Sequence, residues 1–175
     1  MVVEGSLVRL RAPEPADAEA FYAWFNDRDA VAGLGIRYPV PRRAKREWVE
    51  RAQPRYDNAS FSVETRDGGT LLGTCGLFDT DVPENRSAQL GVALVNRAEW
   101  SKGYGTDTVR TLCRFGFEQM NLHRIELLVF ATHPAARRVY ERVGFRADAV
   151  ARKAHWGNGA WVDDVHMSLL EGELR

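Results

Sequence analysis

Two glycines, Gly103 and Gly105, stand between an apolar run and a helical pattern, and this junction constrains the fold more than any other feature of the chain. The preceding run, Ala88–Val95, is nearly all apolar from Leu90 onward, which is typical of a strand buried on both faces. After the glycines, apolar residues recur at helical spacing as far as Met120. The sequence therefore predicts a strand, a glycine-rich loop and an amphipathic helix in direct succession.

The remaining segments predict a mixed α/β (α+β) domain. Alternating residues predict strands at Ser6–Arg11, Ala59–Thr65, Thr70–Phe78, Ala88–Val95, His123–Phe130, Ala147–Trp156 and Trp161–Leu170. Helical spacing predicts four helices. The first runs from Asp17, its N-cap, through Phe25, and the second covers Pro41–Gln53. The third follows the glycine loop, and the fourth runs from Pro134 to near Gly144. Hairpin turns are expected at Asp67-Gly68-Gly69 and Gly157-Asn158-Gly159. We find no repeat and no second unit, so residues 1–175 are expected to form a single domain.

Charge and cysteine content narrow the class of protein. Lys plus Arg equals Asp plus Glu at 24 each, which argues against a nucleic-acid partner with a large electrostatic footprint. The two cysteines lack zinc spacing, so no metal site is expected. We find no signal-peptide pattern and no apolar run long enough to cross a bilayer, so we expect a cytoplasmic protein without a membrane partner.

The loop Trp100–Thr106 is a candidate anion site. The first backbone N–H groups of a helix have no intrahelical partner, and glycines let an anion approach them closely. A phosphate or pyrophosphate is the expected ligand. The P-loop pattern is absent, and Thr108 stands where the dinucleotide fingerprint needs its third glycine. From the glycines alone, a strand-to-helix turn that binds nothing remains equally open.

Three motifs in the same order resemble one family. The loop Trp100-Ser101-Lys102-Gly103-Tyr104-Gly105-Thr106 resembles that of the GNAT N-acetyltransferases, in particular their RimJ/RimL-like branch. The stretch His133–Phe145, with Tyr140 and Gly144-Phe145, resembles the family's next motif. The C-terminal stretch Gly159–Asp163 is similar to its last hairpin. The resemblance implies a GNAT fold: a mixed, mostly antiparallel twisted sheet of about six to seven strands, splayed between the fourth and fifth, with about four helices.

The resemblance also implies an activity, the transfer of an acetyl group from acetyl-CoA to a primary amine by direct attack on the thioester. The acceptor would be a protein N-terminus, a polyamine or an aminoglycoside-like small molecule, and a homodimer is kept open. The rival interpretation is a non-catalytic acyl-CoA-binding module of the same fold, because folds are readily reused.

The resemblance assigns most of the donor site. It implies that the loop binds the pyrophosphate, with Lys102 adding charge, and that the strand end near Val92–Leu94 offers backbone groups to the pantetheine arm and to the oxyanion. The implied cofactor-binding residues are Val92, Ala93, Leu94, Val95, Ser101, Lys102, Gly103, Tyr104, Gly105, Thr106, His133, Ala136 and Tyr140. His133 departs from the family's Asn, so it is expected either to contact the cofactor or to cap the helix that follows.

The resemblance assigns a general acid but leaves the general base open. Tyr140 matches the family tyrosine that serves as general acid toward the thiolate. Branch members often carry a glutamate where this chain has Gln89, which cannot act as a base. The general base is therefore left open among Asp79, Asp81, Glu84 and His155. The acceptor pocket is expected to form from the first two helices, the Gly33–Pro39 loop and the last hairpin, with the aromatic residues Trp24, Phe25, Tyr38, Trp48, Trp156 and Trp161.

Overall fold

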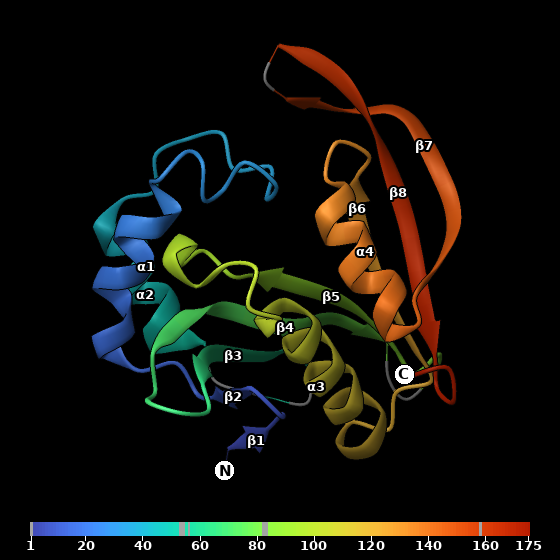
Figure 1. Ribbon diagram of the computed structural model, residues 1–175, viewed down its shortest axis with the longest axis horizontal. Coiled ribbons are helices and arrows are strands. Elements are labelled where there is room, and N and C mark those ends of the chain that lie inside the picture. The colour runs from blue at the N-terminus through green and yellow to red at the C-terminus, as the bar shows by residue number, and fades with distance from the viewer. Residues whose placement is uncertain (1, 53–54, 56, 82–83, 158) are drawn as a thin grey trace.

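The computed structural model describes residues 2–52, 55, 57–81, 84–157 and 159–175. Within them, eight strands form one sheet in the order β1-β2-β3-β4-β5-β6-β8-β7, flanked by four α-helices (Figure 1). The strands are β1 (Val3–Glu4), β2 (Val8–Arg11), β3 (Ala59–Thr65), β4 (Leu71–Asp81), β5 (Ser87–Ala93), β6 (Arg124–Phe130), β7 (Arg146–Gly157) and β8 (Ala160–Leu170). The helices are α1 (Ala18–Phe25), α2 (Arg42–Arg51), α3 (Tyr104–Gln119) and α4 (Pro134–Val143), with 3-10 turns η1 (Pro15–Asp17) and η2 (Arg97–Glu99).

The predicted mixed fold is confirmed, and its splay lies between β5 and β6. These two strands are the parallel pair of the sheet, and every other described neighbouring pair is antiparallel. Their ladder covers Ser87–Gln89 against Arg124–Glu126 and then stops, although both strands continue. β5 is the fourth strand of the sequence prediction, because the two-residue β1 is too short to show an alternating pattern.

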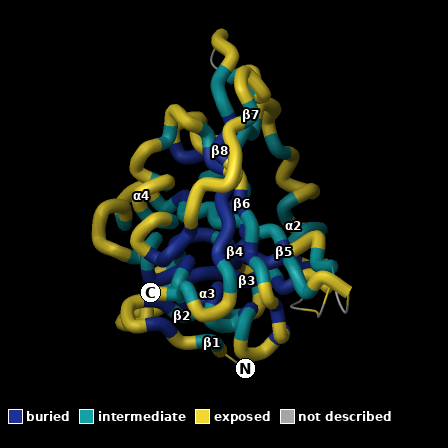
Figure 2. The backbone as a smooth tube through the Cα atoms, turned by 90° about the vertical axis from the view of Figure 1, so that its right-hand side faces the viewer, coloured by how far each residue is buried: buried dark blue, intermediate teal, exposed yellow. Residues whose placement is uncertain are grey.

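The pleat of the strands assigns side chains to the two faces of the sheet. On one face, Leu77, Leu90 and Ile125 join the main core beneath α3 and α4. On the other face, α1 and α2 pack together around Phe21 and Val49. In Figure 1 these two helices lie together at the left of the sheet, away from α4 and the long β7–β8 hairpin. Figure 2 shows the sheet buried at its centre and the tip of that hairpin exposed.

Asp17 stands at the predicted N-cap position of α1, but its side chain makes no capping hydrogen bond to that helix. Its carboxylate accepts hydrogen bonds from the guanidinium of Arg11 at 2.8 Å and from the hydroxyl of Ser62 at 2.7 Å. The carboxylate therefore ties the start of α1 to the sheet. The predicted N-cap position is confirmed, and the carboxylate pairs with neighbouring strands instead of capping the helix.

The end of β5 also differs from its prediction. β5 ends at Ala93 rather than Val95, where its ladder with β4 stops, and the carbonyl of Leu94 accepts the indole N–H of Trp100 at 2.7 Å. The residues predicted to be buried on both faces are largely half-buried, since the splay exposes them to a cavity. The predicted end of the second helix at Gln53 and the turn residue Asn158 lie outside the described residues. Among the described helices, none is long and apolar enough to cross a membrane.

Candidate active site

The glycine loop presents free backbone donors at the start of α3. Gly103 is the N-cap in the left-handed region at φ 89°, and Ser101 is also left-handed at φ 65°. The first amide of this turn with a partner is that of Asp107, which donates to the carbonyl of Gly103 at 3.2 Å. Within the described part of the chain, the N–H groups of residues 101 to 106 donate to no protein acceptor. The helix dipole favours an anion at this point.

The position of Gly105 tests whether an anion fits there. A Cβ on Gly105 would meet only the side chains of Val139 at 3.8 Å and Leu94 at 4.0 Å, which is ordinary contact. Packing within the protein therefore does not require a glycine here. Gly105 lines the cavity, so an added side chain would occupy space beside the free amides. A pyrophosphate fits these donors and this space.

A cavity of about 970 Å³ opens where β5 and β6 separate. Because the strands part, the cavity reaches both faces of the sheet. Its wall on the α3 and α4 face, which we call the α3 half, is lined by the start of α3 and by Cys75, Val92, Leu94, Val109, Val139 and Tyr140. Its wall on the α1 and α2 face, which we call the α2 half, includes Phe25, Lys45, Trp48, Ser60, Phe78 and Phe130.

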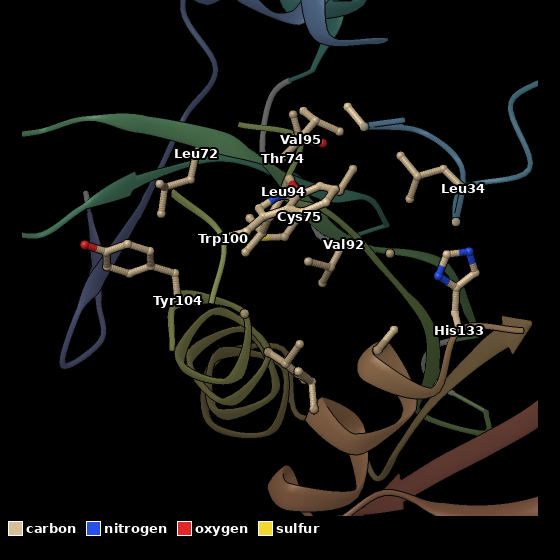
Figure 3. Close-up of a pocket in the computed structure, with 18 of the residues that line it drawn as sticks. Leu34, Leu72, Thr74, Cys75, Val92, Leu94, Val95, Trp100, Tyr104 and His133 are labelled. Atoms are coloured by element: carbon tan, nitrogen blue, oxygen red, sulfur yellow. Dashed lines mark hydrogen bonds between the residues drawn. The ribbon is translucent and has the colours of Figure 1, made fainter. Parts of the chain in front are cut away.

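Nearly all the predicted donor-site residues meet in this cavity. Val92, Leu94, Trp100 and Tyr104 surround the start of α3 in Figure 3. The remaining predicted cofactor residues that line the cavity are Ala93, Val95, Ser101, Gly103, Gly105, Thr106, His133, Ala136 and Tyr140. Lys102 is outside this lining, and its ammonium pairs with Glu99 at 2.8 Å.

Tyr140 stands in the cavity wall on α4. Its ring packs edge-on against Phe145 with centroids 5.8 Å apart, and its hydroxyl makes no hydrogen bond to any described residue. Burial, and secondarily Cys113, raise the pKa of Tyr140 to about 12. The phenol therefore stays protonated at neutral pH and can donate a proton to a group in the cavity.

None of the predicted general bases lines the cavity. Asp79 is exposed near the end of β4, Asp81 ends that strand, and Glu84 is exposed in the segment that follows it. His155 lies on β7, and its ring stacks on Phe130 with centroids 4.1 Å apart. Phe130 lines the cavity, so this contact places His155 beside the cavity wall.

Gln89 lies opposite Glu126 in the β5–β6 ladder. Its amide donates to the Glu126 carboxylate at 3.1 Å, and Glu126 also accepts from Arg124. Glu126 was not among the predicted site residues, although a carboxylate within the largely apolar strand 124–130 could have indicated it. A carboxylate is thus present beside position 89, on the neighbouring strand and outside the cavity lining.

His133 occupies the N-cap position of α4, as one of the two alternatives predicted, and its carbonyl accepts the N–H of Arg137 at 3.2 Å, whereas its side chain makes no capping hydrogen bond. The imidazole lines the cavity and faces Leu34 across it (Figure 3). A Cβ built on Gly33 would lie 3.0 Å from this ring. The ring therefore packs against the loop between α1 and α2 and helps to close the cavity.

The expected aromatic acceptor pocket forms only in part. Phe25 and Trp48 line the cavity, whereas Trp24, Tyr38, Trp156 and Trp161 do not. Tyr38 is 82% exposed. The two hairpin tryptophans instead pack against each other, with centroids 5.2 Å apart, near the tip of the β7–β8 hairpin. Sequence reasoning assigned no role to Lys45 of α2 or to Phe130 of β6, which also line the cavity.

Known proteins share this arrangement. Residues 8–146 match the family model described as an acetyltransferase (GNAT) domain. Probable N-acetyltransferase YjcK of Bacillus subtilis (strain 168) is 32% identical over 177 residues, covering 97% of each chain. Uncharacterized N-acetyltransferase p20 of Bacillus licheniformis is 30% identical over 167 residues, covering 94% of this chain and 93% of the relative.

A solved structure shares the fold. Spermidine N-acetyltransferase from Vibrio cholerae, in complex with CoA and spermine, superposes with a TM-score of 0.85 at 22% identity, covering 95% of this chain and 96% of that one. The family match spans most of the chain and includes both the glycine loop and Tyr140. The chain therefore belongs to the GNAT acetyltransferase family, and the prediction of an acetyl-CoA-dependent N-acetyltransferase is confirmed.

Proposed function

We propose that the protein transfers an acetyl group from acetyl-CoA to a primary amine by direct attack on the thioester, as a member of the RimJ/RimL-like branch. One observation carries the proposal: the cavity joins the two faces of the sheet at the splay, with free loop amides and the Tyr140 hydroxyl on one wall. A donor and an acceptor that enter from opposite faces would meet there. The branch assignment rests on the loop sequence Trp100–Thr106.

The α3 half fits the donor. The free amides of residues 101 to 106 would hold its pyrophosphate, and Gly105 leaves room for it. Beyond Gln89, the edge of β5 that faces β6 has no ladder partner, so its backbone groups are available to the pantetheine arm. Bound acetyl-CoA supplies the thioester that the amine attacks.

Two groups of the chain would act during the transfer. A backbone N–H near Val92–Leu94 would stabilise the carbonyl oxygen as negative charge develops on it. Tyr140 would donate its hydroxyl proton to the departing thiolate. Its raised pKa keeps the hydroxyl protonated until the thiolate leaves. His155 is the candidate base for removing the amine proton, because its contact with Phe130 places it beside the cavity. We assign no catalytic step to Asp79, Asp81 or Glu84, which lie outside the cavity lining.

The acceptor would enter the α2 half, where Phe25, Trp48 and Phe130 form an apolar wall. The Vibrio cholerae structure contains the polyamine spermine with CoA, which supports an amine as the acceptor class. The protein N-terminus, polyamine and aminoglycoside-like amine remain members of that class.

Thiol release on mixing the protein with acetyl-CoA and an amine panel tests this function. We expect release that depends on both enzyme and amine. CoA binding without thiol release from any amine would instead support the non-catalytic acyl-CoA-binding module. The Tyr140→Phe variant is the control, because it keeps the cavity shape and removes the proton donor.

A further inference from the structure

One cation in the α2 half is not explained by the proposed chemistry. Lys45 extends from α2 into the cavity wall, where its ammonium lies 3.2 Å from the centroid of the Phe25 ring and 5.6 Å from that of Trp48. Ring faces attract a cation, but they do not neutralise its charge. None of the described carboxylates pairs with the Lys45 ammonium.

The neighbouring basic residues of α2 behave differently. Arg43 pairs with Glu47 at 2.6 Å, and Arg46 pairs with Glu19 at 2.8 Å. These pairs are solvent-exposed and lie outside the cavity lining. Lys45 is thus set apart from its neighbours both by its place in the cavity wall and by its lack of a carboxylate partner.

The carboxylates of the cavity wall already have cationic partners, and the partner of Asp29, Arg97, also pairs with Asp27 at 3.5 Å. Asp29 accepts from the guanidinium of Arg97 at 3.0 Å, and Glu99 pairs with Lys102 at 2.8 Å. Among the described lining residues, these two are the acidic ones. The wall therefore offers little attraction to a second ammonium group, such as a polyamine carries, while Lys45 offers an unmatched positive charge.

Burial lowers the pKa of Lys45 to about 8, because the wall removes part of the water that stabilises the ammonium ion. The side chain is still mostly protonated at neutral pH. An anionic group in the cavity would stabilise this ammonium with a charge-assisted hydrogen bond. A molecule that enters the α2 half with an anion gains that interaction, and a purely cationic molecule does not.

We propose that the acceptor is an amine that also carries a carboxylate close by, a free α-amino acid being the simplest case, and that Lys45 binds this carboxylate. The inference rests on the proposed acetyl transfer. The apolar wall of Phe25, Trp48 and Phe130 would contact the side chain of such an acceptor.

The test compares two acceptors that differ only in the anion, L-phenylalanine and L-phenylalaninamide, at saturating acetyl-CoA. The ratio of their kcat/KM values is measured for wild type, Lys45→Met, Lys45→Arg and Arg46→Met. Comparing ratios between variants cancels the different basicity of the two amines. Lys45→Met keeps most of the packing and removes the charge, and Arg46→Met removes a charge of the same helix outside the cavity lining.

We expect the acid-to-amide ratio to fall at least tenfold in Lys45→Met, which is about 1.4 kcal/mol. Lys45→Arg should retain most of the ratio, and Arg46→Met should leave it unchanged. Calorimetry on the CoA complex should give the same order, with N-acetylphenylalanine losing affinity in Lys45→Met and N-acetylphenylalaninamide keeping it.

Three outcomes overturn the inference. An unchanged acid-to-amide ratio in Lys45→Met would show that Lys45 does not bind the acceptor. If both acceptors were still acetylated, the proposed function would remain intact. Acetylation of spermidine without acetylation of amino acids would assign a cationic acceptor. Acetylation confined to an amidated peptide with an acidic second residue would assign a protein N-terminus. Failure of every amine to release thiol would contradict the proposed function itself.

Discussion

The two halves of the cavity are built in different ways. The α3 half relies on backbone: free amides at the helix start, the unpaired edge of β5, and glycines that leave room for a ligand. The α2 half relies on side chains from separate elements, such as Phe25, Lys45 and Phe130. A backbone site can be reused with any acceptor, whereas a side-chain wall can change from protein to protein. Under the proposed function, this difference explains why the half assigned to the donor carries a family motif and the half assigned to the acceptor does not.

The largest effect should come from placing a charge in the α3 half. In Gly105→Asp, a carboxylate would occupy the space beside the free amides and repel the pyrophosphate. We expect CoA affinity to fall about 100-fold or more, roughly 2.7 kcal/mol, as measured by calorimetry.

Gly105→Ala is the matched control for that variant. Its methyl group meets only ordinary contacts, and replacing a helical glycine should raise stability by about 1 kcal/mol. A smaller loss of CoA affinity is expected, with an unchanged or higher melting temperature. If Gly105→Asp bound CoA as tightly as Gly105→Ala, the pyrophosphate would have to lie elsewhere.

The next effect separates chemistry from binding within the α3 half. Tyr140→Phe removes the proton donor and keeps the ring that packs on Phe145. We expect kcat to fall about 100-fold, the scale of general acid catalysis, with CoA affinity within about twofold of wild type. Thiol-release kinetics and calorimetry measure the two quantities. A wild-type kcat would show that Tyr140 is not the acid.

The smallest effect should come from the support of the loop. Trp100→Phe removes the indole donor to the carbonyl of Leu94. One such hydrogen bond contributes about 1 kcal/mol, so the melting temperature should fall by about 2–4 °C. Calorimetric unfolding checks this value, and an unchanged transition would mean that the bond does not hold the loop.

The sequence predicted the elements and the α3 half well, because local patterns determine both. Gly103 and Gly105 mark a loop whose free backbone amides are consecutive in the chain, so the motif carries the geometry with it. The extra strand β1 was missed because two residues cannot show a period.

The α2 half was poorly predicted, because tertiary packing decides it. Trp48 and Trp161 were both expected in the acceptor pocket, yet one lines the cavity and the other lies exposed near a hairpin tip. Lys45 belongs to the run of basic residues 42–46, and such a run is typical of a solvated helix face. In the structure its ammonium instead lies over the ring of Phe25 in α1. The carboxylate pairing of Gln89 with Glu126 likewise depends on the strand register.

The division of the cavity into two halves is tested most directly by CoA calorimetry on wild type, Gly105→Asp and Lys45→Met. We expect Gly105→Asp to lose CoA affinity about 100-fold or more and Lys45→Met to bind CoA as wild type does. Equal losses in both variants would contradict it, because CoA would then depend on the α2 half as much as on the α3 half.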